Sequence, residues 1–127
     1  MQHTRNENLR YLFDPRSIAI LGASADLKKV SGRPLDYMLR FRYPGRIYPI
    51  NPKYSEIAGV RCYPSLDTVS DTVDLLMVII PAREILANLE VGLRKGVKVA
   101  VIISGGFAET GDEGKKLQNE LDRKSVV

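Results

Sequence analysis

Cysteine, histidine and tryptophan are scarce in this sequence of 127 residues, which has only Cys62, only His3 and no tryptophan. A single cysteine excludes an intramolecular disulfide and a cysteine-based zinc site, and it fits a reducing, cytoplasmic compartment. No apolar run approaches the roughly 18 residues of a membrane span, and the first ten residues are too polar for a secretory signal. We therefore expect no membrane partner.

Groups that could carry catalysis are also few. His3 lies in a polar stretch where no nucleophile–base pair can be built around it. Cys62 reads more readily as a small buried residue than as a reactive thiol. Asp67, Asp71 and Asp74 precede an apolar run and are typical of caps and turns rather than of a metal cluster. We expect neither a catalytic residue nor a metal site.

Positive charge is modest overall, at +4, and the basic residues are scattered among acids instead of forming a block. This distribution argues against nucleic acid as a partner. Between residues 28 and 53, however, Asp36 is the sole acid among many bases. These bases are Lys28, Lys29, Arg33, Arg40, Arg42, Arg46 and Lys53. The enrichment favours a ligand that carries phosphate, and a merely solvated basic face is the alternative.

Apolar runs and helical periodicity alternate along the chain. Uniformly apolar runs predict strands at 17–21, 46–50, 74–80 and 97–103, and Pro49 indicates an edge position for the second of them. Helical spacing predicts helices at 33–41, at 85–93 with a stop at Lys95-Gly96, and at 112–122. A short strand at 57–60 and 62–63 and a brief helix near 65–69 complete the prediction.

Strands that are apolar on both sides and alternate with helices indicate an α/β fold. We expect a Rossmann-like, doubly wound, mainly parallel sheet with helices on both faces. Residues 1–127 would form one domain, of which 1–10 would be flexible. The apolar pair Val126-Val127 could begin another strand, so we expect a fragment or an N-terminal domain of a longer protein.

In such sheets the ligand lies beyond the carboxyl ends of the strands, where the strand order reverses. After the first strand, Gly22, Ala23 and Ser24 form a small-residue loop that precedes Lys28. Its N–H groups and the following helix N-terminus can receive phosphate oxygens. The loop does not satisfy the G-x-G-x-x-G fingerprint of dinucleotide-binding domains, and an ordinary turn would look similar.

The second and third strand ends carry different chemistry. Lys53 lies where an NAD-binding domain places an acid on the ribose, and it would favour a phosphorylated ribose, as in NADP or coenzyme A. A solvated turn lysine is the alternative. Pro81 and Ala82 follow the third strand and offer a rigid apolar wall for an adenine or pantetheine arm, or simply end the strand.

The fourth strand end, Ser104, Gly105, Gly106 and Phe107, combines paired glycines with an aromatic ring. The glycines would let the backbone approach a ligand closely, and Phe107 would pack beside it. A simple loop is again the alternative. All four segments fall at predicted strand ends, where the fold can bring them together, so we expect one binding site.

Taken in order, residues 20–24, 48–53, 78–82 and 104–109 resemble the motifs of the CoA-binding domain of NDP-forming acyl-CoA synthetases, such as the ADP-forming acetate–CoA ligase α subunit. Residues 12–18 look like the start of that domain, and the similarity runs from about residue 11 to 121. The chain is more distantly similar to the succinyl-CoA synthetase α subunit. It departs from the pattern at Gly105, where alanine is usual, and lacks the Gly-Pro-Asn motif that commonly follows.

The resemblance implies that the domain binds coenzyme A and belongs to an acid–CoA ligase whose phosphorylated histidine and ATP-grasp region lie outside this chain. It implies contacts to the CoA diphosphate from 22–24, to its phosphates from Lys28 and Lys53, to adenosine or pantetheine from 81–82, and to the thiol end from 104–107. The remaining synthetase domains or an ATP-grasp subunit would be the partners. An NADP-binding reductase domain and a stand-alone regulatory module that senses CoA or a nucleotide are the competing readings.

Overall fold

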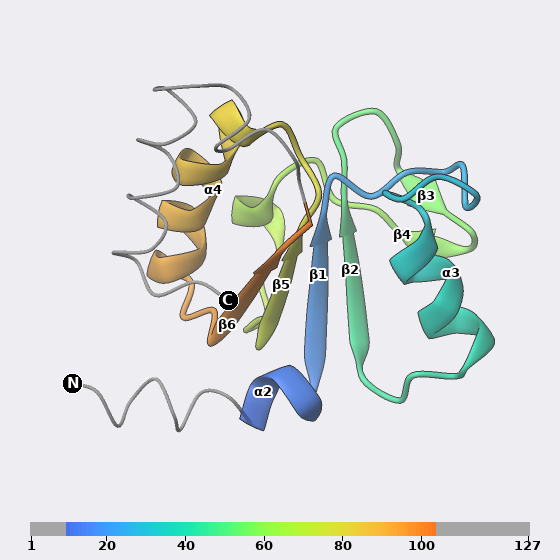
Figure 1. Ribbon diagram of the computed structural model, residues 1–127, viewed down its shortest axis with the longest axis horizontal. Coiled ribbons are helices and arrows are strands. Elements are labelled where there is room, and N and C mark those ends of the chain that lie inside the picture. Colours follow the sequence, from blue (N-terminus) through green and yellow to red (C-terminus); the bar gives the residue numbers. More distant parts are fainter. Residues whose placement is uncertain (1–9, 104–127) are drawn as a thin grey trace.

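The computed structural model describes residues 10–103. Its centre is a four-stranded parallel sheet in the order β2-β1-β5-β6. The strands are β1 (Ser17–Leu21), β2 (Arg46–Ile50), β5 (Leu75–Val78) and β6 (Val99–Ile102). The chain moves from β1 outward to β2 and then crosses back to β5 on the other side of β1 (Figure 1). The strand order therefore reverses at β1, next to β5.

Each face of the sheet carries its own apolar core, which follows from the alternation of side chains along β1. Ile18 and Ile20 pack toward α3 (Arg33–Arg40), whereas Ala19 and Leu21 pack toward α4 (Ala82–Arg94). Figure 1 shows the two helices on opposite sides of the sheet. The expectation of a doubly wound, Rossmann-like α/β fold is confirmed.

The helix ends follow the sequence signals closely. Pro34 occupies the first turn of α3, where a missing N–H costs no hydrogen bond. The helix α4 ends at Arg94 with Lys95 as its C-cap, and the next residue, Gly96, has a positive φ of 80°. A left-handed residue after a helix is most easily a glycine, so the predicted stop at Lys95-Gly96 is confirmed.

The strand β2 lies at the edge of the four-stranded sheet, as Pro49 predicted. The carbonyl of Pro49 points outward and accepts a hydrogen bond from Tyr63 N–H at 2.8 Å. Because N–H and C=O of one strand residue point to the same side, the absent N–H of Pro49 also faces outward and costs β2 no bond to β1.

The segment between β2 and β5 differs from the expectation. The predicted strand 57–60 is instead an antiparallel hairpin of β3 (Glu56–Ile57) and β4 (Val60–Arg61). Ala58 and Gly59 form its turn, with φ values of 52° and 82°. Two positive φ values are what a two-residue hairpin turn needs, so these residues reverse the chain rather than extend it. The brief helix is a 3-10 turn, η1 (Leu66–Thr68).

Other differences concern the ends of elements. The strands β5 and β6 are shorter than the apolar runs that predicted them, because residues at both ends of each run belong to the adjoining loops. A short helix, α2 (Arg10–Phe13), precedes β1 and had no sequence signal. The predicted helix at 112–122 lies outside the described residues. No helix within 10–103 is both long and apolar enough to cross a bilayer.

Candidate functional site

Three loops meet at the carboxyl end of the sheet, where the strand order reverses. Gly22 N–H donates to the carbonyl of Ile50 at 2.9 Å, and Ile79 N–H donates to the carbonyl of Leu21 at 2.8 Å. A Cβ built on Gly22 would lie 2.2 Å from the carbonyl oxygen of Ile79. With its φ of +91°, Gly22 is thus the residue at which the loops after β1 and β5 can touch.

The loop between β1 and α3 is folded tightly on itself. Ser24 Oγ accepts a hydrogen bond from Asp26 N–H at 3.0 Å, and Asp26 Oδ1 accepts one from Lys28 N–H at 3.1 Å. Ser24 N–H donates in turn to the carbonyl of Ser31 at 3.2 Å. Because the Ser24 hydroxyl only accepts in this arrangement, its own proton remains available for a ligand.

Two further donors lie in this loop. The N–H groups of Ala23 and Ala25 have no hydrogen-bond partner within residues 10–103. Ala23 is fully buried, and a buried N–H group without a partner is uncommon in proteins. Its burial also closes the Ala23 N–H to a ligand in this arrangement. Ala25 is exposed, so its N–H is the backbone group of this loop that a phosphate oxygen can reach.

The two predicted lysines are both exposed, one on each of the neighbouring loops. Lys28 follows the tight turn of the β1 loop, and its carbonyl accepts a hydrogen bond from Arg33 Nε at 3.2 Å. Lys53 follows β2, and its N–H donates to Asn51 Oδ1 at 2.9 Å. Exposed ammonium groups on adjacent loops provide positive charge for phosphates without the cost of burying it.

The sequence analysis left Asn51 without a role, but the structure gives it one. Its Nδ2 donates to the carbonyl of Ala23 at 2.8 Å, so its side chain joins the loops after β2 and β1. No sequence pattern identifies this contact, since it depends on the parallel pairing of β1 with β2.

The remaining predicted residues lie on the loops after β5 and β6. Pro81 precedes α4 as an exposed residue, and Ala82 is the first, half-buried residue of that helix. They continue from Ile79, which contacts Gly22, so they belong to the same end of the sheet. Ser104, Gly105, Gly106 and Phe107 lie outside the described residues, and their part in the site stays a prediction.

Cys62 is a buried free thiol beside the backbone of Asn51. Its Sγ donates to the carbonyl of Asn51 at 3.5 Å. Burial raises the pKa of this thiol, which disfavours the thiolate needed for nucleophilic chemistry. Across residues 10–103, the acidic, cysteine and histidine side chains form no cluster that could hold a metal ion.

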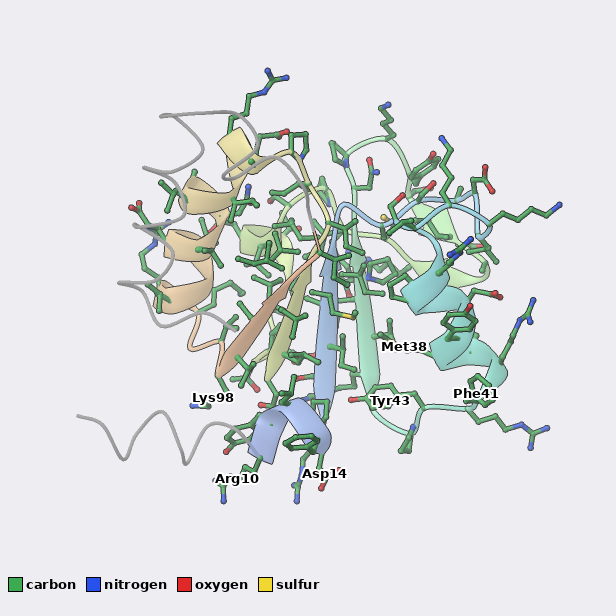
Figure 2. The ribbon with its side chains drawn as sticks, viewed as in Figure 1. Arg10, Asp14, Met38, Phe41, Tyr43 and Lys98 are labelled. Carbon is green, nitrogen blue, oxygen red and sulfur yellow. The ribbon has the colours of Figure 1, made fainter. Side chains whose placement is uncertain are left out.

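Hollows also occur at the opposite, amino end of the strands, where the sequence suggested no site. One of about 380 Å³ is lined by Arg10, Tyr11, Asp14, Arg16 and Asp74. A second, of about 440 Å³, shares Asp14 and Arg16. Figure 2 shows Arg10 and Asp14 at this base of the molecule, near Lys98. Two arginines and two aspartates offset each other in the first hollow. In the second, Arg46 lies 3.9 Å from the carboxylate of Asp71, so much of the positive charge at this end is already compensated.

Comparison with known proteins decides what the carboxyl-end arrangement belongs to. Residues 16–122 match the model of the family described as "CoA binding domain". The chain belongs to this family. The match covers β1 and every loop of the candidate site, and it confirms the family that the ordered strand-end motifs indicated.

Similar proteins of known sequence include ADP-forming ligases. This CoA-binding domain is 41% identical over 113 residues to the α subunit of acetate–CoA ligase (ADP-forming) II of Pyrococcus furiosus, covering 89% of the chain and 24% of that protein. It is 42% identical over 117 residues to acetate–CoA ligase (ADP-forming) of Methanocaldococcus jannaschii, covering 92% of the chain and 16% of that protein. The chain thus spans a quarter or less of these relatives.

A solved structure agrees with this. The apo form of dinucleotide-forming acetyl-coenzyme A synthetase 1 from Ca. Korarchaeum cryptofilum superposes with a TM-score of 0.83 at 38% identity. The superposition covers 92% of this CoA-binding domain and 25% of the synthetase chain. Fold and family are therefore shown for the domain, whereas the named relatives are proteins of which it matches only 16% to 25%.

Proposed function

We propose that this CoA-binding domain binds coenzyme A across the carboxyl ends of β1, β2 and β5, as one part of an ADP-forming acid–CoA ligase. The observation that carries the proposal is the contact of three loops at the point of strand reversal. The loops after β1 and β2 each carry an exposed lysine, and the exposed Ala25 has an N–H group with no partner within residues 10–103. In a ligase, coenzyme A is consumed as a substrate, so it would be held reversibly rather than as a resident cofactor.

Each group has a role in the proposal. The loop 22–24 lies beside the diphosphate, which accepts hydrogen bonds from the Ser24 hydroxyl and from the N–H of the exposed Ala25 that follows it. Lys28 and Lys53 bind phosphates, with Lys53 on the 3′-phosphate of the ribose. Pro81 and Ala82 form an apolar wall for adenosine or pantetheine. The segment 104–107 meets the thiol end.

Activation of the acid is assigned to other parts of the ligase. Among residues 10–103, no nucleophile lies beside a general base in a catalytic arrangement, and the one thiol there is buried. The remaining synthetase domains or an ATP-grasp subunit would supply the phosphorylated histidine and the nucleotide site. The relatives named above span enough further sequence for these parts. A cytoplasmic setting belongs to the same proposal and rests on the single cysteine.

Calorimetric titration of the 127-residue chain with coenzyme A, dephospho-CoA and NADPH tests the proposal. We expect coenzyme A to bind about fivefold more tightly than dephospho-CoA, because only coenzyme A carries the 3′-phosphate that Lys53 would meet. Equal affinities would contradict the role of Lys53. Binding of NADPH without binding of coenzyme A would favour a reductase domain instead.

A further inference from the structure

Asn51 is the first residue after β2, and its backbone N–H, its carbonyl and both ends of its side-chain amide make hydrogen bonds. Its backbone N–H donates to the carbonyl of Tyr63 at 2.9 Å, and its carbonyl accepts from the thiol of Cys62 at 3.5 Å. Its side-chain Nδ2 donates to the carbonyl of Ala23 at 2.8 Å, and its Oδ1 accepts from the N–H of Lys53 at 2.9 Å. The backbone is held by the edge of the sheet, and the side chain joins two loops.

The two side-chain bonds act on different parts of the candidate site. Ala23 lies in the middle of the loop 22–24, here called the diphosphate loop, and is fully buried. Without Asn51 its carbonyl would therefore lose a hydrogen-bond partner that water cannot easily replace. The bond to the N–H of Lys53 closes an Asx turn, which fixes the backbone from which the lysine side chain leaves β2. One planar amide thus sets the positions of two phosphate-binding elements.

We propose that Asn51 is the positioning residue of the coenzyme A site, holding the diphosphate loop through its NH₂ group and the turn of Lys53 through its oxygen. This inference rests on the proposed function. Asparagine suits the task because one amide supplies both a donor and an acceptor, whereas aspartate would supply no donor. Aspartate would also bring negative charge toward the phosphates, as the ribose-binding acid of NAD domains does.

Two substitutions separate the two bonds. Asn51→Ser keeps a short neutral acceptor that can close a similar turn at Lys53, but it is too short to reach Ala23. Asn51→Ala removes both bonds. Asn88→Ala is the matched control, since Asn88 Nδ2 also donates to a backbone carbonyl, that of Glu84 at 2.9 Å, but entirely within α4. Each variant is titrated with coenzyme A and with dephospho-CoA, and urea unfolding verifies that it is folded at the titration temperature.

We expect Asn51→Ser to weaken binding of both ligands by the same factor, about five- to tenfold, and to keep the preference for coenzyme A. Asn51→Ala should weaken both ligands at least as much and bring the ratio of their dissociation constants close to one. Asn88→Ala should bind both ligands as the unsubstituted chain does. The ratio is informative because a general loss of stability would not change it.

Several results would overturn the inference. Folded Asn51 variants that bind both ligands with unchanged affinity would show that the two loops hold their positions without the amide. An Asn88→Ala variant that loses as much affinity as Asn51→Ala would assign the effect to overall stability. A preserved ratio in Asn51→Ala would remove the link to Lys53. If the unsubstituted chain binds neither ligand, the proposed function itself fails, and that result is distinct from the others.

Discussion

The two ends of the parallel sheet are built differently. At the amino end, polar groups are tied to one another: Ser17 Oγ donates to the carbonyl of Thr72 and accepts from Asp74 N–H, both at 2.9 Å. Tyr43 OH donates to the carbonyl of Pro15 at 2.6 Å. At the carboxyl end, backbone contacts and the Asn51 amide fix the loops, while loop N–H groups stay without partners among the described residues. At the amino end the polar groups bond to one another, whereas the carboxyl end has donors that can bond to a ligand.

This difference shows why a hollow alone does not locate the site. The amino-end hollow of about 380 Å³ is lined by two arginines and two aspartates, whose charges offset each other. A ligand with several phosphates needs positive charge that is not already matched, together with N–H donors. The carboxyl end supplies both, and it is also where the strand order reverses. The chemistry of the loops therefore favours the carboxyl end for the proposed site.

Gly22→Ala should produce the largest effect at the carboxyl end. The new Cβ would lie 2.2 Å from the carbonyl oxygen of Ile79, and the residue would keep a φ of +91° that alanine rarely adopts. We expect a loss of about 3 kcal/mol or more in the free energy of unfolding, because both strain and a backbone clash must be relieved. Urea denaturation followed by circular dichroism measures it.

Gly59→Ala is the matched control for this prediction. Gly59 has a similar φ of +82°, but a Cβ there would meet nothing within 4 Å. We expect Gly59→Ala to lower the free energy of unfolding by about 1 kcal/mol, from backbone strain alone. Equal losses for the two variants would show that the close approach of the loops after β1 and β5 adds nothing to stability.

Ser17→Ala should give the next largest effect and should act on the amino end alone. Ser17 is fully buried, and its removal leaves the carbonyl of Thr72 and the N–H of Asp74 without their partner. We expect a loss of about 2 kcal/mol in the free energy of unfolding, with the affinity for coenzyme A unchanged. Thr68→Ala breaks an exposed side-chain bond and should cost about 0.5 kcal/mol. A fall in affinity for Ser17→Ala would show that the two ends are coupled.

Tyr48 connects stability to alkaline pH. Burial, together with the hydrogen bond to Asp71, raises the pKa of Tyr48 from 10.0 to about 12. Between these two values the folded state holds a proton that the unfolded state has lost, so stability is complete below pH 10 and falls as the pH rises toward 12. We expect a fall of about 1 to 2 kcal/mol from this residue.

Urea unfolding at pH 8, 10 and 11 measures that fall, and Tyr48→Phe serves as the comparison. The variant should lose less stability between pH 10 and 11 than the unsubstituted chain. Some decline should remain, because burial also raises the pKa of Tyr43. An identical decline in both proteins would assign the whole effect to other groups.

Much of the fold could be predicted because its signals are local. A few neighbouring residues are enough to predict the strand β1, from its apolar run, and the end of α4, from Lys95-Gly96. Pro49 predicted an edge strand because it lacks an N–H. The positions of the candidate loops followed from the fold class, since strand carboxyl ends converge in any open parallel sheet.

What could not be predicted depends on contacts between distant segments. The hairpin turn at Ala58-Gly59 looks like part of a strand until its partner strands are known. The hydrogen bond from the Asn51 side chain to the carbonyl of Ala23 requires β1 and β2 to be paired in register, with Leu21 opposite Ile50. The short helix α2 has only four residues, too few to show helical periodicity in the sequence. The sequence therefore predicted where a candidate site lies, while the pairing of the strands shows how its loops are held.

Lys53→Ala should give the smallest effect, and it compares the two ends of the sheet most directly. Lys53 is an exposed lysine at the carboxyl end, and Lys98 is an exposed lysine at the amino end, where Figure 2 labels it. Neither substitution should change the free energy of unfolding by more than about 0.5 kcal/mol. Lys53→Ala should lower the affinity for coenzyme A roughly fivefold and leave the affinity for dephospho-CoA unchanged. In 0.5 M salt most of this difference from the unsubstituted chain should disappear. Lys98→Ala should leave the affinity for both ligands unchanged. Equal losses of affinity in the two variants would mean that net charge alone, and not the position of Lys53, attracts the ligand.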